Sequence, residues 1–225
     1  MEFNTATYGG ASLAVERNRV LRNTYFLLAL SMLPTAAGAL LGIALQFHMS
    51  AGFGLLLFFG VAFGSFYLIE KTKETAAGVF ILLGFTGFMG LWLSQILQVA
   101  LRFSNGPEMI GMAAIGTAAI FFSLAAVATV TKKDFSFMGK FLFIGMVIVI
   151  LASIANIFFA IPAASLAISV VVLGIFSAYI LYDVSRIVNG GETNYISATL
   201  QLYLDVYNVF VSLLNILMML TGRRD

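Results

Sequence analysis

Two acidic residues attract attention because each lies inside an apolar stretch long enough to cross a membrane. Asp183 falls about one turn inside the end of one such stretch, and Asp205 falls about two turns inside the next. Since only a short loop joins the two stretches, both carboxyl groups can reach a similar depth. Two close carboxyl groups avoid two buried charges by sharing a proton, and such a pair can sense pH or hold a cation.

Asp205 also belongs to a row of polar residues, which we call the polar stripe. The stripe consists of Gln201, Asp205, Asn208, Ser212 and Asn215. Its steps of four, three, four and three place these residues on one face of a helix, and the other faces carry apolar residues. A polar face within lipid must turn toward other protein or water. We therefore expect residues 197–221 to form the core helix of a membrane bundle, with Asp183 and Asp205 as ion-path and pH-sensor residues.

Two simpler interpretations of the acids stay open. Asp183 can be solvated near the membrane interface and paired with Arg186, three residues further on, while Asp205 forms only a hydrogen bond within the bundle. An intramembrane aspartyl protease also uses two aspartates on adjacent spans, but no motif around either residue supports proteolysis. His48 is the only histidine and there is no cysteine. We therefore expect no enzyme, no catalytic residue, no resident metal and no cofactor.

The composition identifies the class of protein. The chain is 61% hydrophobic and only 10% charged, with a mean hydropathy of +1.02. A soluble protein needs far more charge on its surface, so we expect an integral membrane protein whose main partner is the lipid bilayer. A net charge of +2, with basic residues in short loops, gives no indication of nucleic-acid binding. A cleavable signal peptide is not expected, because the apolar run follows a polar start and is too long.

The apolar pattern predicts an all-α fold with seven transmembrane helices. Residues 1–22 are expected to be a mobile polar tail, residues 23–221 a membrane domain, and residues 222–225 a short C-terminal tail. The expected spans are 23–47, 51–70, 75–101, 107–131, 140–159, 162–187 and 197–221. Pairs and groups of small residues are expected to allow close helix packing. They are Gly38 with Gly42, Gly60 with Gly64, and Gly84 with Gly87 and Gly90.

The basic residues predict an orientation. Nine of them fall on the side of the N-terminus: Arg17, Arg19, Arg22, Lys71, Lys73, Lys132, Lys133, Lys140 and Arg186. Among the loops of the opposite side only Arg102 is basic, so the N-terminus is expected in the cytoplasm. Seven spans leave Arg223 and Arg224 outside, against the rule. A final helix that re-enters the membrane is the alternative, but its length favours a full crossing.

Several segments resemble the Bax inhibitor family of multi-span proteins, and within it the bacterial YccA branch. The most specific is GGETNYISATLQLYLDVYNVFVSLLNIL at residues 190–217. Four further segments resemble the same family: LRNTYFLLALS (21–31), GFTGF (84–88), KKDFSFMG (132–139) and ANIFF (155–159). The resemblance covers nearly the whole chain.

The resemblance implies a fold in which the last helix is central and is wrapped by three helical hairpins. It also implies a bacterial-type inner-membrane protein that acts as a pH-sensitive calcium leak, with an acid pair on the last two helices as sensor. Asp183 and Asp205 match those positions. In relatives with this mechanism an arginine of the second helix latches onto an acid of the pair. Residues 51–70 contain no arginine, so the latch is absent or replaced.

The YccA branch implies a second role. Its members are associated with the membrane AAA protease FtsH, as substrates or modulators of membrane-protein quality control. The polar tail before Asn23 is a plausible handle for such a protease. The alternative function is therefore a non-transporting modulator or substrate of that protease, and the two roles are compatible.

Overall fold

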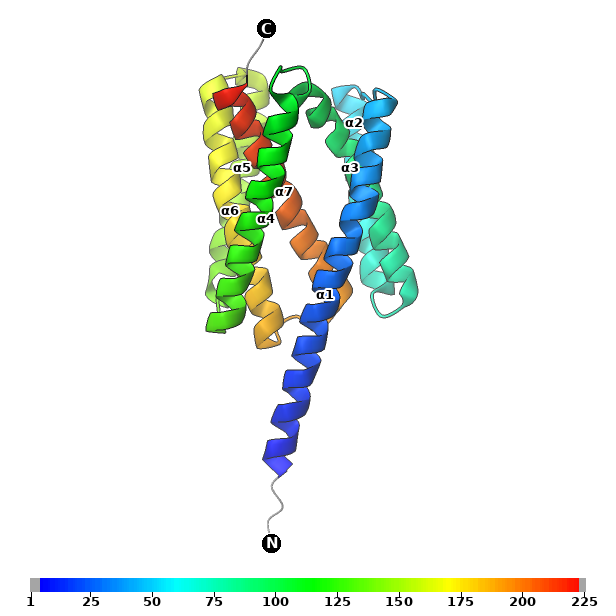
Figure 1. Ribbon diagram of the computed structural model, residues 1–225, viewed down its shortest axis with the longest axis vertical. Coiled ribbons are helices and arrows are strands. Elements are labelled where there is room, and N and C mark those ends of the chain that lie inside the picture. The colour runs from blue at the N-terminus through cyan, green and yellow to red at the C-terminus, as the bar shows by residue number, and fades with distance from the viewer. Residues whose placement is uncertain (1–4, 223–225) are drawn as a thin grey trace.

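The computed structural model describes the backbone of residues 5–222 and the side chains of residues 15–50 and 52–222 (Figure 1). Within these residues the chain is all-α, with one short 3-10 helix at Ser136–Met138. The α-helices are α1 (Thr5–Ala44), α2 (Ala51–Thr72), α3 (Ala76–Ala100), α4 (Gly106–Thr131), α5 (Gly139–Phe159), α6 (Pro162–Asn189) and α7 (Tyr195–Thr221). All seven are long and apolar enough to cross a membrane, which confirms the predicted fold class.

Helix ends follow local chemistry. Pro162 begins α6 and Pro107 lies in the first turn of α4, where a missing backbone N–H costs nothing. Gly190 ends α6 with a φ of 80°, a conformation that favours glycine. Asn194 caps α7, because its side-chain oxygen accepts hydrogen bonds from the backbone N–H groups of Ile196 and Ser197 at 2.9 and 3.0 Å.

The segment before Asn23 differs from the sequence prediction. The sequence predicts a mobile tail up to residue 22, whereas α1 is helical from Thr5 and extends well beyond the rest of the bundle (Figure 1). The membrane-competent part of this helix begins at Val15. Residues 11–22 contain neither glycine nor proline and include alanine, leucine, glutamate and arginine. These residues favour a helix even where the segment is polar, so polarity alone misplaced the boundary.

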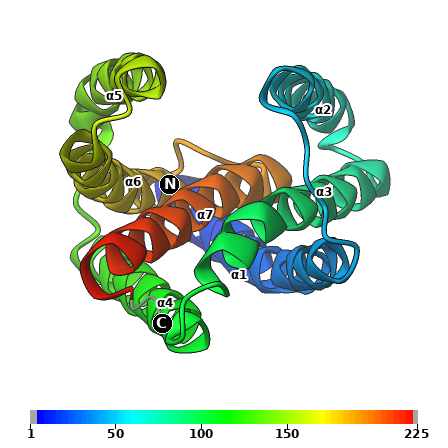
Figure 2. The same cartoon turned by 90° about the horizontal axis from the view of Figure 1, so that it is seen from above.

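Helix α7 lies in the middle of the bundle, as the sequence predicts. It packs against α1, α2, α3, α4 and α6, and Figure 2 shows it crossing between them. Helices α2 with α3 and α5 with α6 form hairpins of chain neighbours. In the described part of the chain, α1 packs along α3 rather than α2, and α5 reaches α6 but not α7. No helix therefore packs directly on the side of α7 that lies between α2 and α5.

Close contact between α1 and α3 depends on glycine. A Cβ atom added at Gly38 would overlap the carbonyl oxygen of Gly87, and one added at Gly90 would overlap the carbonyl oxygen of Thr35. By contrast, an added Cβ at Gly60 would meet no atom within 4 Å. The expected small-residue packing is therefore present between α1 and α3, whereas Gly60 and Gly64 of α2 face open space.

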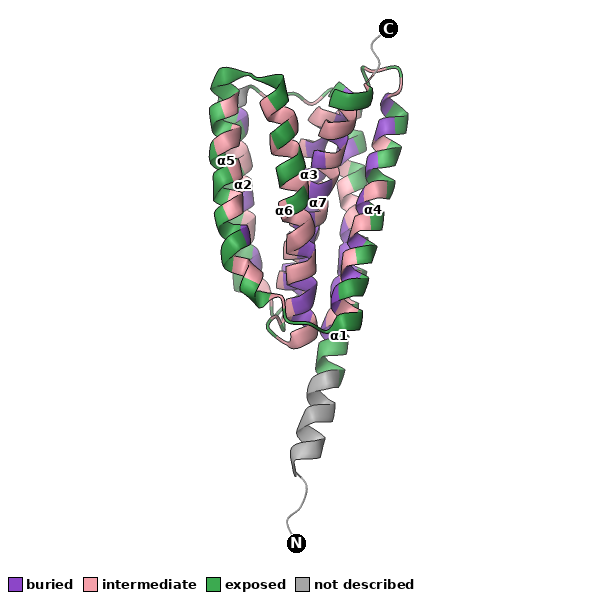
Figure 3. Cartoon of the chain, turned by 90° about the vertical axis from the view of Figure 1, so that its left-hand side faces the viewer, coloured by how far each residue is buried: buried purple, intermediate pink, exposed green. Residues whose placement is uncertain are grey.

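Burial separates an inner from an outer surface. Figure 3 shows buried positions on α7 and on the inward faces of its neighbours, and exposed positions along the outer faces. Leu82, Ile180 and Leu202 are fully buried, whereas Phe141 and Phe158 are largely exposed. Large apolar side chains on the outside match a lipid environment, where every backbone polar group is satisfied within its own helix.

Candidate functional site

The two aspartates meet across the interface between α6 and α7. Asp183 is 6% exposed and Asp205 is 4% exposed, and their carboxyl groups lie within hydrogen-bonding reach of each other. Atom Oδ2 of Asp205 is buried without a hydrogen-bond partner among the described residues. The expectation of similar depth is thus matched by the geometry, and the open Oδ2 leaves one acceptor of the pair available.

Contact between two carboxyl groups limits their protonation states. If both were ionised, two negative charges would lie side by side in a region of low dielectric. One shared proton turns this repulsion into a hydrogen bond and leaves a single negative charge on the pair. A cation at the same oxygens would compete with that proton.

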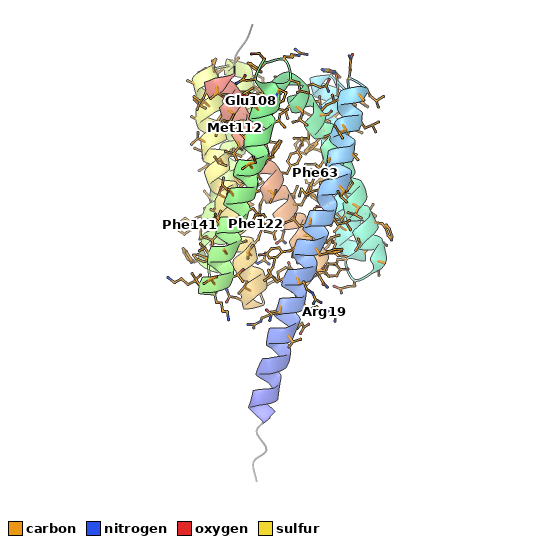
Figure 4. The ribbon with its side chains drawn as sticks, in the orientation of Figure 1. Arg19, Phe63, Glu108, Met112, Phe122 and Phe141 are labelled. Carbon is orange, nitrogen blue, oxygen red and sulfur yellow. The ribbon has the colours of Figure 1, made fainter. Side chains whose placement is uncertain are left out.

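The pair lies on the wall of a cavity of about 550 Å³ on the side of α7 between α2 and α5. Helices α2, α3, α5, α6 and α7 all contribute to its lining. Four phenylalanines of α2 form one wall, and Figure 4 labels one of them: Phe58, Phe59, Phe63 and Phe66. Its polar lining residues are Ser153, Asp183, Gln201, Asp205 and Asn208. The lining of the cavity is therefore mostly apolar, and its few polar groups come mainly from α6 and α7.

The structure divides the polar stripe. Gln201, Asp205 and Asn208 line the cavity, together with Asp183 from α6. Ser212 is buried and Asn215 is half-buried, but neither lines this cavity. The Asn208 side-chain amide donates to the carbonyl oxygen of Leu204 at 2.8 Å. The first three members of the stripe thus belong to the candidate site, and the last two belong to helix packing.

Arg186 contacts the aspartate pair, as the three-residue spacing from Asp183 allows. Its Nη1 atom lies 3.8 Å from Asp183 Oδ1 and 3.4 Å from Gln201 Oε1. Its Nη2 atom lies 3.9 Å from Glu192 Oε2, and its guanidinium lies 5.6 Å from the ring centre of Tyr182. The three-residue spacing from Asp183 indicates the first contact. The contact with Gln201 depends on how α6 and α7 pack, which spacing alone does not reveal.

A network of loop contacts closes the same end of the bundle. The Asn194 side-chain amide donates to the carbonyl oxygen of Lys73 at 3.0 Å and to Glu74 Oε1 at 3.1 Å. The Ser185 hydroxyl donates to the carbonyl oxygen of Lys133 at 2.9 Å and accepts from the backbone N–H of Phe135 at 3.0 Å. The loops α2–α3, α4–α5 and α6–α7 are therefore held together at the end where the aspartates lie.

The remaining candidates for chemistry lie elsewhere. His48 is in the α1–α2 connection, where its Nδ1 atom lies 2.6 Å from the carbonyl oxygen of Gln46. That connection is at the opposite end of the bundle from the loop after Asp183, as is Glu108 (Figure 4). The structure therefore does not bring a histidine to the aspartate pair.

With this geometry established, comparison with known proteins defines the class. Residues 17–222 match the family model Bax1-I, described as "Inhibitor of apoptosis-promoting Bax1". The chain is a seven-helix membrane protein of the Bax inhibitor family. The family resemblance of the sequence is thereby confirmed.

Individual relatives are similar along most of their length. The "Modulator of FtsH protease YccA" of Escherichia coli K12 is 44% identical over 200 residues, covering 89% of this chain and 90% of the relative. An "Uncharacterized membrane protein" of Vibrio cholerae is 42% identical over 204 residues, covering 90% of each chain. The "Uncharacterized protein NMA0420" of Neisseria meningitidis is 39% identical over 223 residues, covering 96% and 97%. The likeness therefore extends through all seven helices.

Proposed function

We propose that this protein is a pH-sensitive cation leak of a bacterial inner membrane, with calcium as the permeant ion. The observation that carries the proposal is the contact between two buried carboxyl groups on the wall of a cavity. Charge buried among apolar helices is costly, and acids in such places usually mark an ion path or a proton relay. The polar cavity would be the path, and Asp183 with Asp205 would be its gate and sensor.

The direction of gating follows from the contacts of Arg186. When the pair holds one shared proton, its single negative charge attracts the guanidinium, and this contact joins α6 to the loop that follows it. A second proton removes that charge and weakens the attraction. The end of the bundle near Asp183 would then loosen, so the leak would increase as pH falls. Arg186 would supply from α6 the latch that α2 lacks.

Calcium would pass through the cavity without being stored there. Calcium prefers six to eight oxygen ligands. The two carboxyl groups, with the side-chain oxygens of Gln201 and Asn208, supply part of that shell, and water would supply the rest. Within residues 5–222, no group of three or more His, Cys, Asp or Glu side chains could hold a metal ion. This donor set suits weak, transient binding, which conduction requires.

The orientation rests on the basic residues. All nine Lys and Arg residues named above for the N-terminal side belong to α1 or to the ends and loops of the other helices there. An excess of Lys and Arg marks the cytoplasmic side. We place the N-terminus and the aspartate end in the cytoplasm. The inner-membrane assignment is supported by an Escherichia coli relative with the printed name "Inner membrane protein YccA".

The proposal is tested by calcium flux into proteoliposomes at several pH values. Wild type is compared with Asp183→Asn and Asp205→Asn, and Asn215→Leu serves as a control from the same helix outside the cavity. We expect a leak that rises as pH falls, that loses its pH dependence in both aspartate variants, and that is retained in the control. Flux no greater than in protein-free vesicles at every pH would overturn the proposal.

A second candidate function is modulation of a membrane protease. It is favoured by the printed name of the Escherichia coli relative and by the helical extension of α1 beyond the bundle. Such an extension could be gripped without unfolding the membrane domain. Deleting the residues before Arg17 would then reduce co-purification with the protease or slow turnover of the protein, and Asp205→Asn would change neither. Unchanged association after the deletion would contradict this role.

A further inference from the structure

A second hollow lies on another side of α7 and is unrelated to the aspartates. This groove has a volume of about 780 Å³ and lies between α1 and α4, with α7 and α3 as its floor. In the described part of the chain, α1 and α4 do not pack against each other. Residues from all four helices line it, for example Ala36 and Leu40 of α1, Ala114 and Ala118 of α4, and Val206 of α7.

The groove needs an apolar occupant. Among its few polar side chains, Tyr25 has a buried hydroxyl without a hydrogen-bond partner in the described part of the chain, whereas the others bond within the protein. The Thr117 hydroxyl donates to the carbonyl oxygen of Ala113 at 2.7 Å, and the Thr35 and Tyr203 hydroxyls lie 2.9 Å apart. Tyr25 of α1 and Phe121 of α4 have ring centres 5.9 Å apart, so an aromatic pair bridges the two walls of the groove. If a groove of this size were empty, the side chains along both of its walls would lose dispersion contacts.

At one end of the groove, a basic residue lies on or directly after each of the two helices that border it, α1 and α4. Arg22 precedes the groove-lining Leu40 by 18 residues, and Lys132 follows the groove-lining Ala114 by the same interval. Eighteen residues make about five full turns, so Arg22 shares a face of α1 with the groove. Lys132 is the C-cap of α4, with a φ of 52°, and directly follows the last turn of that helix. The N-terminal part of α1 and the C-terminal end of α4 lie at the same end of the bundle (Figure 1), and both cations are exposed.

We propose that this groove binds one anionic phospholipid from the leaflet on the side of Arg22 and Lys132. An acyl chain would lie between α1 and α4, and the phosphate would lie between the two cations. Arginine can bind a phosphate with two parallel hydrogen bonds, and lysine adds a compact charge. From Tyr25 to Ile43 the groove runs ~27 Å along α1, and an acyl chain from one leaflet would fill the half nearest Arg22, because one leaflet is about half of the ~30 Å hydrocarbon core.

Charge complementarity favours a lipid over a helix from another protein. An apolar helix would fill the hollow but would leave Arg22 and Lys132 without an anion at its end. An anionic phospholipid satisfies the apolar walls and both cations at once. A zwitterionic lipid carries the same acyl chains but offers no net negative charge, so the site should prefer the anionic lipid.

The test measures lipid binding to the full-length protein in detergent by native mass spectrometry. Phosphatidylglycerol is compared with phosphatidylcholine of the same acyl chains. The double variant Arg22→Gln with Lys132→Gln should lose at least about tenfold in affinity for phosphatidylglycerol. The control, Arg19→Gln with Lys133→Gln, removes the same charge from neighbouring positions off the groove face and should lose little. An equal loss in both pairs, or no preference for the anionic lipid, would overturn the proposal.

A second pair of variants tests the groove without changing charge. Ala36→Trp fills it from α1, and Ala118→Leu narrows it from α4, so the conclusion does not depend on one variant folding. We expect either change to reduce phosphatidylglycerol binding severalfold in protein that remains monodisperse and helical. Unchanged binding in the folded variants would show that the cations hold lipid at the surface, and the site would not be the groove.

Discussion

The two hollows beside α7 differ in chemistry although the same helix lines both. On the side of α6, α7 presents Asp205 and Asn208 to a cavity that also contains Asp183. On the side of α1 and α4 it presents Val206 and Phe210 to an almost wholly apolar groove. Asp205 and Val206 are adjacent in the chain, yet their side chains are rotated by about 100°. A single helix can therefore separate a cavity that contains acidic residues from an apolar groove.

The difference shows what makes a buried acid tolerable. An ionised Asp in the middle of a span costs on the order of 3 kcal/mol on the insertion scale. Asp205 avoids this cost because Asp183 can share a proton with it, and Arg186 lies within 3.8 Å of Asp183. On the groove side no charged residue is among the lining residues. Whether a buried aspartate is tolerated therefore depends on the residues that surround it rather than on its depth in the membrane.

The largest effect is expected from placing an acid on the wrong side of α7. Val206→Asp puts a carboxyl group on the apolar groove, and we expect it to destabilise the protein by on the order of 3 kcal/mol. Asn208→Asp introduces the same group on the cavity side and should cost clearly less. Thermal unfolding of both variants in detergent, followed by circular dichroism, measures the difference. Equal destabilisation would mean that the two sides do not differ as environments.

The next effect concerns the wall of the groove. Gly38→Ala should destabilise the protein by about 1–3 kcal/mol, because the new methyl group overlaps the backbone of α3 and forces α1 outward. Gly60→Ala is the matched control, since its Cβ enters open space. The same unfolding measurement applies. If both substitutions had the same effect, close contact between α1 and α3 would not position the groove.

The smallest effect is expected at the end of the polar cavity. Arg186→Gln removes the cation that pairs with Asp183, and for a partly exposed contact worth ~1 kcal/mol the leak at neutral pH should rise about fivefold. Arg186→Lys keeps the charge but loses the fork of the guanidinium, so it should give an intermediate leak. Flux into proteoliposomes at neutral pH measures both. An unaltered leak in Arg186→Gln would remove Arg186 from the gate.

Local patterns predicted much of the fold. The predicted spans 107–131 and 162–187 lie close to the observed bounds of α4 and α6, and the spacing of Gln201, Asp205 and Asn208 indicated the polar face of α7. These features depend on neighbours within a few turns, which the sequence shows directly. The number of spans and the central place of the last helix were predicted for the same reason, with support from the family resemblance.

Features that depend on packing between distant helices were not predicted. Periodicity places Ser212 and Asn215 on the polar face, but it does not show where the cavity beside that face ends. The spacing indicated the pairing of Arg186 with Asp183, but not the contact of Arg186 with Gln201, because that contact joins two helices. The groove between α1 and α4 left no pattern, since its lining residues look like any lipid-facing surface. Its existence depends on α1 packing along α3 rather than against α4.

The account depends most on the aspartate pair, and one flux measurement tests it directly. Calcium entry into proteoliposomes would be followed as pH is lowered from mildly alkaline to mildly acidic, for wild type and for Asp205→Asn. Fewer protons bound at higher pH leave the pair charged and the contact with Arg186 intact, so wild-type flux should rise as pH falls. Asp205→Asn cannot share a proton in the same way, and its flux should be nearly independent of pH. A variant with the same pH dependence as wild type would contradict the account.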